Sequence, residues 1–461
     1  MSGWNLDNSY ARLPRAFYKE MDLSPVAEPK LVKFNEKLAE ELGLPTDGID
    51  AGWFTGNVSP KGSQPLAQAY AGHQFGYFNM LGDGRALLLG EQLTPDGKRV
   101  DIQLKGSGRT PYSRSGDGRA ALGPMLREYL ISEAMHGLGI PTTRSLAVAA
   151  TGEITLRERP LPGAILTRVA DSHIRVGTFA YASEWATEKE LKALADYTME
   201  RHFGDIPNKG DYLAFLHKIA ERQGKLIAQW QLVGFVHGVM NTDNMAIAGE
   251  TIDYGPCAFM DSYDPDSVYS SIDREGRYAY KNQPVIGAWN LARLTETMLP
   301  FISLEAANEV IRHYWRALNA EWLEGMGRKL GIFKLIPEDE SLFDDLLALM
   351  KELSADYTNT FVAFTFEEEI VGLKNWRKRW QNRLEGQPQS WEESQALMKK
   401  NNPQVIPRNH KVEEALMLAE HGDMGAFDKL LEAVQNPYES GAKEFMEPAE
   451  PGVCYKTYCG T

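Results

Sequence analysis

The 461-residue sequence contains only three cysteines, Cys257, Cys454 and Cys459, which are too few to build a disulfide framework. It also lacks the run of about 20 apolar residues that a membrane-spanning helix requires. No basic segment followed by an apolar core stands at the N-terminus, so no signal peptide is indicated. We therefore expect a soluble, cytoplasmic protein that has no membrane partner.

Positive charge is scarce as well. The 49 lysines and arginines are outnumbered by 63 aspartates and glutamates, which gives a formal net charge of −14. This balance argues against a broad nucleic-acid surface, and it means that an anionic ligand must be held by a local cluster of basic residues. The length allows roughly two to three domain-sized units with a large core, and we expect a monomer.

What the sequence does contain is a group of oxygen-bearing side chains after a predicted long helix. Asp243 and Asn244 lie in a predicted loop, and Asp253 ends a predicted hairpin over residues 245–252. Such oxygen ligands suit Mg²⁺ or another hard cation. The spacing is similar to that of a kinase catalytic loop and its metal-binding aspartate, except that Val239 occupies the position of the catalytic aspartate. An ordinary Asn/Asp turn explains this stretch equally well.

The first third of the chain has the alternating pattern and the turn residues of consecutive strands. Strands are predicted over residues 70–80, 86–93 and 100–105. Gly82 and Gly84 form a turn whose backbone N–H groups can approach phosphate oxygens, and Lys105 ends the third strand on its polar face. The alternative interpretation is a tight turn and a surface lysine.

A glycine-rich loop at residues 106–120 concentrates the basic charge. Together with the helix predicted at residues 120–138, it carries Arg109, Arg114, Arg119 and Arg127. Glu128 lies on that helix, where it can pair with Lys105. A strand predicted over residues 164–169 carries Arg168, and Arg175 follows it; two arginines leaving the end of a sheet are typical of a phosphate clamp. A flexible loop with ordinary surface charges is the alternative.

The remaining patterns divide the chain. A helix is predicted near residues 28–42, two strands are predicted over residues 145–150 and 154–158, and helices dominate beyond residue 188. We expect an N-terminal extension at residues 1–69, a β-rich lobe at 70–180, a helical lobe at 181–300, a helical region at 301–435 and a tail at 436–461.

Longer motifs are distributed over nearly the whole chain. They include Asp7-Asn-Ser-Tyr-Ala-Arg-Leu-Pro14, Ala71-Gly-His-Gln-Phe-Gly76, Gly82-Asp-Gly-Arg85, Gln103-Leu-Lys-Gly-Ser-Gly108, Thr110-Pro-Tyr-Ser-Arg114, Gly116-Asp-Gly-Arg-Ala120, Leu126-Arg-Glu-Tyr-Leu130, His237-Gly-Val-Met-Asn-Thr-Asp-Asn244, Ile252-Asp-Tyr-Gly-Pro256 and Ile406-Pro-Arg-Asn-His410. In the combination of these motifs, the chain resembles the selenoprotein O (SelO) family of protein adenylyltransferases. The resemblance implies an α+β, protein-kinase-like bilobal fold with a β-rich N-lobe and a helical C-lobe, which holds ATP in reversed orientation.

The same resemblance implies transfer of AMP from ATP to Ser, Thr or Tyr hydroxyls of proteins, with release of pyrophosphate. Asp243 would take the acceptor proton, while Asn244 and Asp253 would bind Mg²⁺ or Mn²⁺. The nucleotide would be held by Gly82, Gly84, Arg85, Lys105, Asp117, Gly118, Glu128, Arg168, Arg175 and Asp253. Some members prefer UTP with Mn²⁺, so uridylylation stays open. A conventional phosphotransferase and a non-catalytic nucleotide-binding pseudokinase are the alternative functions.

The cysteines also leave alternatives open. In bacterial members of the family a bond between the tail and the activation segment can control activity. Here Cys257 is the cysteine near that segment, so a bond from Cys257 to Cys459, a bond from Cys454 to Cys459, and inert thiols are all compatible with the sequence.

Overall fold

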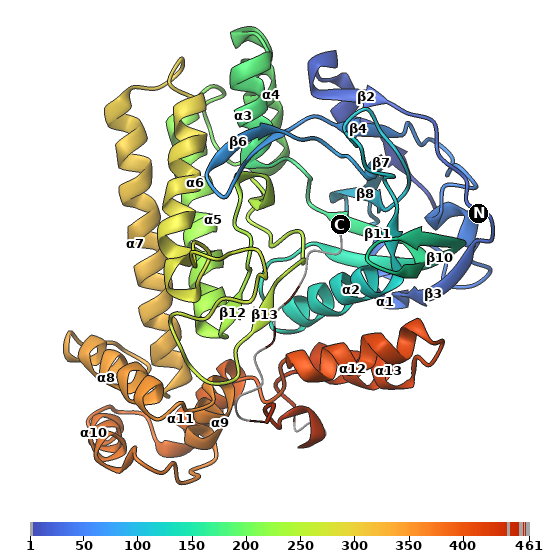
Figure 1. The fold of residues 1–461 in the computed structure, drawn as a ribbon. Coiled ribbons are helices and arrows are strands. Elements are labelled where there is room, and N and C mark those ends of the chain that lie inside the picture. Colours follow the sequence, from blue (N-terminus) through green and yellow to red (C-terminus); the bar gives the residue numbers. More distant parts are fainter. Residues whose placement is uncertain (1–2, 440–442, 451–454, 456, 458–461) are drawn as a thin grey trace.

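The structure is a computed structural model that describes residues 3–439, 443–450, 455 and 457. A nine-stranded sheet lies on one side of the molecule and long helices stand on the other (Figure 1). The described residues form thirteen α-helices, so the expected combination of α and β structure is confirmed. The predictions about Cys454 and Cys459 lie outside the described residues.

All strand pairs in the large sheet are antiparallel, in the order β2-β4-β7-β8-β11-β10-β3, with β1 on β7 and β9 on β11. Its strands are β1 (Leu6–Asp7), β2 (Tyr18–Glu20), β3 (Lys30–Phe34), β4 (Leu66–Gln68), β7 (Ala86–Leu93), β8 (Arg99–Lys105), β9 (Ala120–Ala121), β10 (Arg144–Leu156) and β11 (Pro160–Ala170). Two small sheets pair β5 (Ala71–Gln74) with β6 (Tyr77–Met80) and β12 (Phe235–Val236) with β13 (Ala258–Phe259). The N-terminal strands therefore belong to the same sheet as the strands that lead to the site.

Most of the helices lie on the other side of the molecule from this sheet, whereas α1, α2, α12 and α13 lie near it (Figure 1). Their bounds are α1 (Glu36–Leu42), α2 (Leu122–Gly137), α3 (Val176–Trp185), α4 (Glu188–His202), α5 (Tyr212–Leu232), α6 (Gln283–Thr297), α7 (Leu304–Lys329), α8 (Glu338–Glu352), α9 (Tyr357–Thr365), α10 (Lys374–Glu385), α11 (Trp391–Asn401), α12 (Asn409–Glu420) and α13 (Gly425–Gln435). Helices α5, α6 and α7 pack side by side (Figure 1). The short 3-10 turn at Thr242–Asn244 follows α5 and faces the sheet side.

Helix α2 is buried on nearly all sides, because β10 and β11 cover one face and α12 and α13 cover another (Figure 1). Leu126, Leu130 and Ala134 on this helix are all buried. Glu128 is 3% exposed and lies on the same helix. A buried carboxylate needs a charged or hydrogen-bonding partner, and the fold brings that partner from the end of β8.

Four local predictions were wrong. Residues 28–42 do not form one helix, because β3 covers Lys30–Phe34 and Asn35 then caps the short α1 through its side chain. Strand β3 pairs with β10, where Phe34 lies opposite Ala147. This distant pairing overrides the local helical pattern.

Residues 245–252 do not form a hairpin either. Ala246 bridges to Arg175 and Thr251 bridges to Thr142, so this segment pairs with two other parts of the chain rather than with itself. The two strands predicted over residues 145–158 are one long strand, β10, with an irregularity between Ala150 and Ile154. Conversely, the single strand predicted over residues 70–80 is two strands, β5 and β6, which turn back and pair with each other. None of the described helices has the length and apolar character needed to cross a membrane.

Candidate active site

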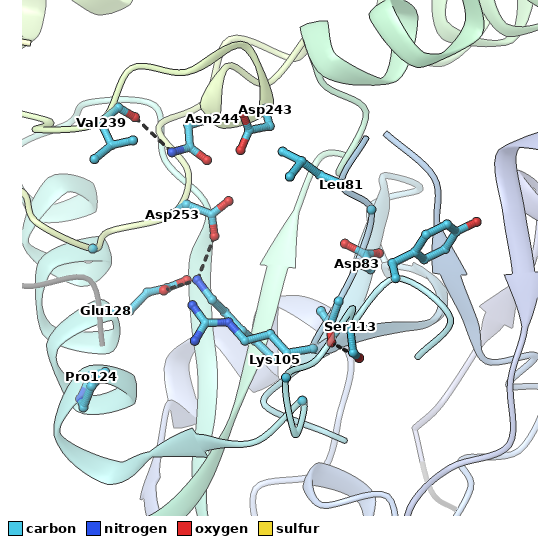
Figure 2. Close-up of a pocket in the computed structure, with 18 of the residues that line it drawn as sticks. Leu81, Asp83, Lys105, Ser113, Pro124, Glu128, Val239, Asp243, Asn244 and Asp253 are labelled. Carbon is cyan, nitrogen blue, oxygen red and sulfur yellow. Dashed lines mark hydrogen bonds and ion pairs between the residues drawn. The ribbon is translucent and has the colours of Figure 1, made fainter. Parts of the chain in front are cut away.

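A cavity of about 370 Å³ lies between the sheet, α2 and the loop that ends at Asn244 (Figure 2). Every residue that the family resemblance assigned to the nucleotide, to a metal or to the role of base lines this cavity. They are Gly82, Gly84, Arg85, Lys105, Asp117, Gly118, Glu128, Arg168, Arg175, Asp243, Asn244 and Asp253. The chain thus brings together side chains from positions far apart in the sequence.

Lys105 lies at the centre of a buried network of charges. Its Nζ donates to Glu128 Oε2 at 2.5 Å and to Asp253 Oδ1 at 2.7 Å (Figure 2). Lys105 ends β8, whereas Glu128 stands on α2, so the predicted pairing of the strand lysine with the helix glutamate is confirmed. The network joins the sheet, the buried helix and the loop after residue 252.

Arg168 joins the same network from β11. Its Nη1 donates to Asp253 Oδ1 at 2.7 Å and to Glu128 Oε1 at 3.2 Å, and its Nη2 donates to Gln103 Oε1 at 2.6 Å. Both Arg168 and Glu128 have side chains that are 3% exposed. Two cations and two carboxylates therefore offset one another away from bulk water, where such interactions are strongest.

Arg175 brings a third cation to Asp253. Its Nη1 lies 3.4 Å from Asp253 Oδ2 and donates to the backbone carbonyl of Asp243 at 3.2 Å. The guanidinium carbon also stands 4.4 Å from the centre of the Tyr70 ring. Arg175 thus spans the gap between Asp253 and Asp243, which are the two carboxylates assigned to metal binding and proton transfer.

Asp253 is kept ionised by this arrangement. Burial by itself would raise the pKa of its carboxyl group, but Lys105, Arg168 and Arg175 together hold that pKa well below its usual value. Its backbone has a φ of 62°, which a non-glycine residue rarely adopts. Strained backbone of this kind concentrates at functional sites, where the surrounding structure compensates for it.

Asp243 lies in a different environment. It is 7% exposed, and its Oδ1 has no hydrogen-bond partner among the described residues. Burial raises the pKa of this carboxyl group to about 7. A carboxylate with such a pKa is suited to accept a proton near neutral pH.

Asn244 and Asp253 face the same part of the cavity (Figure 2). The Asn244 amide nitrogen donates to the Val239 carbonyl at 2.9 Å, which directs the amide oxygen away from that contact. The described residues contain no group of three or more His, Cys, Asp or Glu side chains able to hold a metal ion. The donor set nevertheless fits a hard cation that keeps water or phosphate ligands, because Asn244, Asp253 and the unpartnered Asp243 Oδ1 are all oxygen donors.

The glycines of the cavity wall are required by close contacts. Gly82 has a φ of +95°, and a side chain there would collide with the Tyr112 ring. Gly118 has a φ of +70°, and a Cβ atom would collide with the backbone of Gly108. Backbone this close to the cavity can present N–H groups to a ligand.

The predicted arginine cluster is only partly brought to the cavity. Arg114 and Arg119 line it. Arg127 does not, because it is 6% exposed and donates to Glu413 and to the Cys257 carbonyl, both at 2.9 Å. Arg109 donates to the Arg114 carbonyl at 3.4 Å and is not among the described residues that line the cavity. Arg127 therefore fastens α2 to α12 and to the segment after Asp253, which corrects its predicted role in phosphate binding.

Asp117 lines the cavity but is held by another side chain. Its carboxylate accepts from both terminal nitrogens of Arg157, at 2.9 and 3.1 Å. It also accepts from the Arg119 backbone N–H at 2.9 Å. Asp117 thus orders the glycine-rich loop around Gly118, and Arg157 is a lining residue that the sequence did not single out.

Asp83 and Tyr70 were also missed. Asp83 is 2% exposed, and burial raises its pKa to about 6, although its Oδ2 accepts from the Gln68 backbone N–H at 3.0 Å. Asp83 stands between Gly82 and Gly84, which were already assigned to the site, so its position in the sequence could have indicated that it lines the cavity. Tyr70 had no such signal, because its contact with Arg175 depends on tertiary structure alone.

This combination of features defines the site of an enzyme that acts on a phosphate-bearing substrate. Paired cations face the cavity beside oxygen donors suited to a metal and a carboxylate of raised pKa. The comparisons with known proteins agree with this class. A family model described as "Protein adenylyltransferase SelO" matches residues 2–435.

Relatives in three bacteria are similar over the full chain. Proteins from Clostridium beijerinckii, Brevibacillus brevis and Halalkalibacterium halodurans, each named protein nucleotidyltransferase YdiU, are 57%, 56% and 56% identical. The matches cover 100% of this chain and 98% of each relative. The chain belongs to the SelO family of nucleotidyltransferases.

Proposed function

We propose that this protein transfers AMP from ATP to Ser, Thr or Tyr hydroxyls of other proteins and releases pyrophosphate. The observation that carries the proposal is the convergence of Lys105, Arg168 and Arg175 on Asp253, beside an Asp243 carboxylate with an unpartnered oxygen. The cations would hold the terminal phosphates, and Asp243 would face the phosphorus that is attacked.

The proposed orientation of ATP follows from where the cations lie. Lys105 and Arg168 are nearly inaccessible and are tied to Glu128, so they can hold only the part of the ligand that enters farthest. A triphosphate entering with its terminal phosphates first leaves the α-phosphate nearer to Asp243. Val239, which stands where a kinase would have its catalytic aspartate, supports this reversal within a kinase-like arrangement.

In the proposed mechanism the protein positions the groups and offsets charge. Asp243 accepts the proton of the incoming hydroxyl, and its raised pKa of about 7 suits this step. Asn244 and Asp253 would hold Mg²⁺ or Mn²⁺, which supplies positive charge to the phosphate oxygens when bound. Lys105, Arg168 and Arg175 stabilise the negative charge on the departing pyrophosphate.

Position-specific labelling tests the proposal. Purified enzyme is incubated with a protein mixture and with ATP labelled either at the α-phosphate or at the γ-phosphate, in Mg²⁺ and in Mn²⁺. We expect label on protein only from the α-position, and no label with Asp253→Ala. Label from the γ-position alone would show a phosphotransferase and contradict the proposal. A parallel reaction with α-labelled UTP measures whether uridine nucleotides are also transferred.

A further inference from the structure

The hairpin of β5 and β6 carries an exposed apolar surface next to the cavity. Tyr77 and Met80 on β6 are 77% and 46% exposed, Phe78 is 41% exposed and Trp185 at the end of α3 is 44% exposed. The Phe78 and Trp185 rings stack with centroids 5.6 Å apart and an interplanar angle of 9°. Contiguous exposed aromatic side chains of this kind mark interaction sites. Phe78 and Met80 share one face of β6, on which Phe78 stacks with Trp185, whereas Tyr77 points to the other face. We call Phe78, Met80 and Trp185 the hairpin surface.

The hairpin is fastened directly to the loop that carries Asp243. Gly72 packs so closely against the Asp243 carboxylate that a Cβ atom would collide with it. The His73 backbone N–H donates to Thr242 Oγ1 at 2.8 Å. The Phe75 backbone N–H donates to the Tyr278 hydroxyl at 3.1 Å, and that hydroxyl donates to Asn241 Oδ1 at 2.6 Å. The position of the hairpin relative to the proposed base is therefore fixed by several contacts.

The outer edge of β6 has backbone groups available for pairing. Strand β6 pairs only with β5 in a two-stranded sheet of the described residues. The Leu81 N–H donates to the Tyr70 carbonyl at 3.0 Å, and Gly72 lies opposite Asn79, so the bonded positions of β6 are the odd-numbered ones. The backbone groups of Phe78 and Met80 consequently point away from β5. Such an edge is a template for one more strand.

The two ends of β6 differ in a way that orients a bound segment. At the turn before Tyr77, Gly76 lies against Arg277, whose guanidinium stands 4.9 Å from the Trp289 ring centre. Arg277 forms no ion pair with a carboxylate among the described residues, and its Nε has no hydrogen-bond partner there. At the other end, Leu81 and Gly82 line the cavity. A positive charge thus marks one end, and the proposed reaction centre lies at the other.

We propose that an extended segment of the acceptor protein docks on the free edge of β6, which deepens the proposed function and rests on it. The segment pairs its backbone with Phe78 and Met80 and packs apolar side chains on the hairpin surface. An acidic residue of the segment faces Arg277, and its hydroxyl-bearing residue enters the cavity past Leu81. At about 3.3 Å per residue, β6 sets the acidic residue and the hydroxyl roughly five residues apart.

Peptide acceptors with altered backbones test the docking mode. Twelve-residue peptides with one Ser, Thr or Tyr are offered with α-labelled ATP, and the best acceptors are then N-methylated one residue at a time. We expect loss of labelling of at least tenfold at every second position of the paired stretch and little change between them, because alternate N–H groups of an added strand face β6. Equal effects at all positions, or labelling of intact proteins without labelling of any peptide, would overturn the inference.

Charge swaps at Met80 separate docking from misfolding. Met80→Glu should favour acceptors with Lys or Arg opposite this position by at least tenfold, and Met80→Lys should favour Asp or Glu, with an unchanged KM for ATP. Val371→Glu is the matched control, since Val371 is 93% exposed and lies in the turn before α10. Unchanged acceptor preference in both Met80 variants would reject the docking surface while the proposed function stands.

Two further outcomes are informative. If the wild-type enzyme labels neither peptides nor proteins, the proposed function itself fails and the docking inference fails with it. If sedimentation shows a wild-type dimer that Met80→Glu converts to a monomer, the edge of β6 joins two copies of this chain, and the docking inference is wrong.

Discussion

The two sides of the cavity hold their charges differently. On the paired side, Lys105, Glu128, Arg168 and Asp253 contact one another within 2.5 to 3.2 Å. On the open side, Asp243 has an oxygen without a described partner. The pKa of Asp253 lies well below its usual value, whereas burial raises that of Asp243 to about 7. Pairing, and not burial alone, therefore decides which carboxylate stays charged and which can exchange a proton.

The largest expected effect concerns the open side. Asp243→Asn keeps the size of the side chain but removes the proton acceptor, so we expect kcat for AMP transfer to fall by about 10²- to 10⁴-fold. Binding of ATP should change little, because the proposal places the terminal phosphates on the paired side. Initial rates at saturating ATP and a separate binding titration measure both quantities. A variant with wild-type kcat would show that Asp243 is not the base.

A smaller effect is expected when the paired side is broken. Lys105→Met leaves Glu128 and Asp253 buried with one partner fewer, so the free energy of unfolding should fall by about 3 kcal/mol. Urea unfolding of the metal-free protein measures this loss. Lys378→Met on α10 is the control, because Lys378 is exposed and should change stability by less than about 0.5 kcal/mol. Equal stability of the two variants would mean that the network contributes nothing to the fold.

The smallest expected effect has the opposite sign. In the folded protein the pKa of Asp243 is about 7, against 3.8 for the free group, so between these values only the unfolded chain releases this proton. Its contribution to stability therefore becomes less favourable as pH rises from about 4 to 7 and is constant above 7. Asp243→Asn removes this penalty, for which the two pKa values set an upper limit of about 4 kcal/mol at pH 7. The buried Asn amide is itself left without a partner, which costs about 2 kcal/mol, so the metal-free protein should be stabilised by about 2 kcal/mol at pH 7. The gain should be lost as the pH falls toward 4.

Unfolding at several pH values in a chelating buffer measures this gain. A loss of stability at pH 7 for Asp243→Asn would contradict the difference between the two sides. Lys105→Met should lower the free energy of unfolding at pH 7 and Asp243→Asn should raise it, although both positions are buried.

The sequence predicted the site better than it predicted the fold around it. Strand β7 was placed correctly from its apolar run and its glycine turns, and the pairing of Lys105 with Glu128 followed from the order of strand and helix. These features depend on short stretches of chain. The same reasoning failed at residues 28–42, because the partner of β3 is β10, far along the chain.

The contacts that the sequence could not show are those between distant elements. Arg127 looked like one more loop cation, but α2 is covered by α12, and Glu413 on that helix takes the charge. Helix α3 was not predicted, although its first residue follows directly after the phosphate-clamp candidate Arg175. Tyr70 and Arg157 reach the cavity only through the folded chain and were missed, as was Asp83, although it lies inside a motif.

A crystal of the complex with a non-transferable ATP analogue and Mg²⁺ would show directly how the nucleotide lies in the cavity. We predict that the β- and γ-phosphates contact Lys105, Arg168 and Arg175, and that the α-phosphorus is the one nearest Asp243. A γ-phosphorus nearest Asp243, with no phosphate contacting Arg168 or Arg175, would contradict the account.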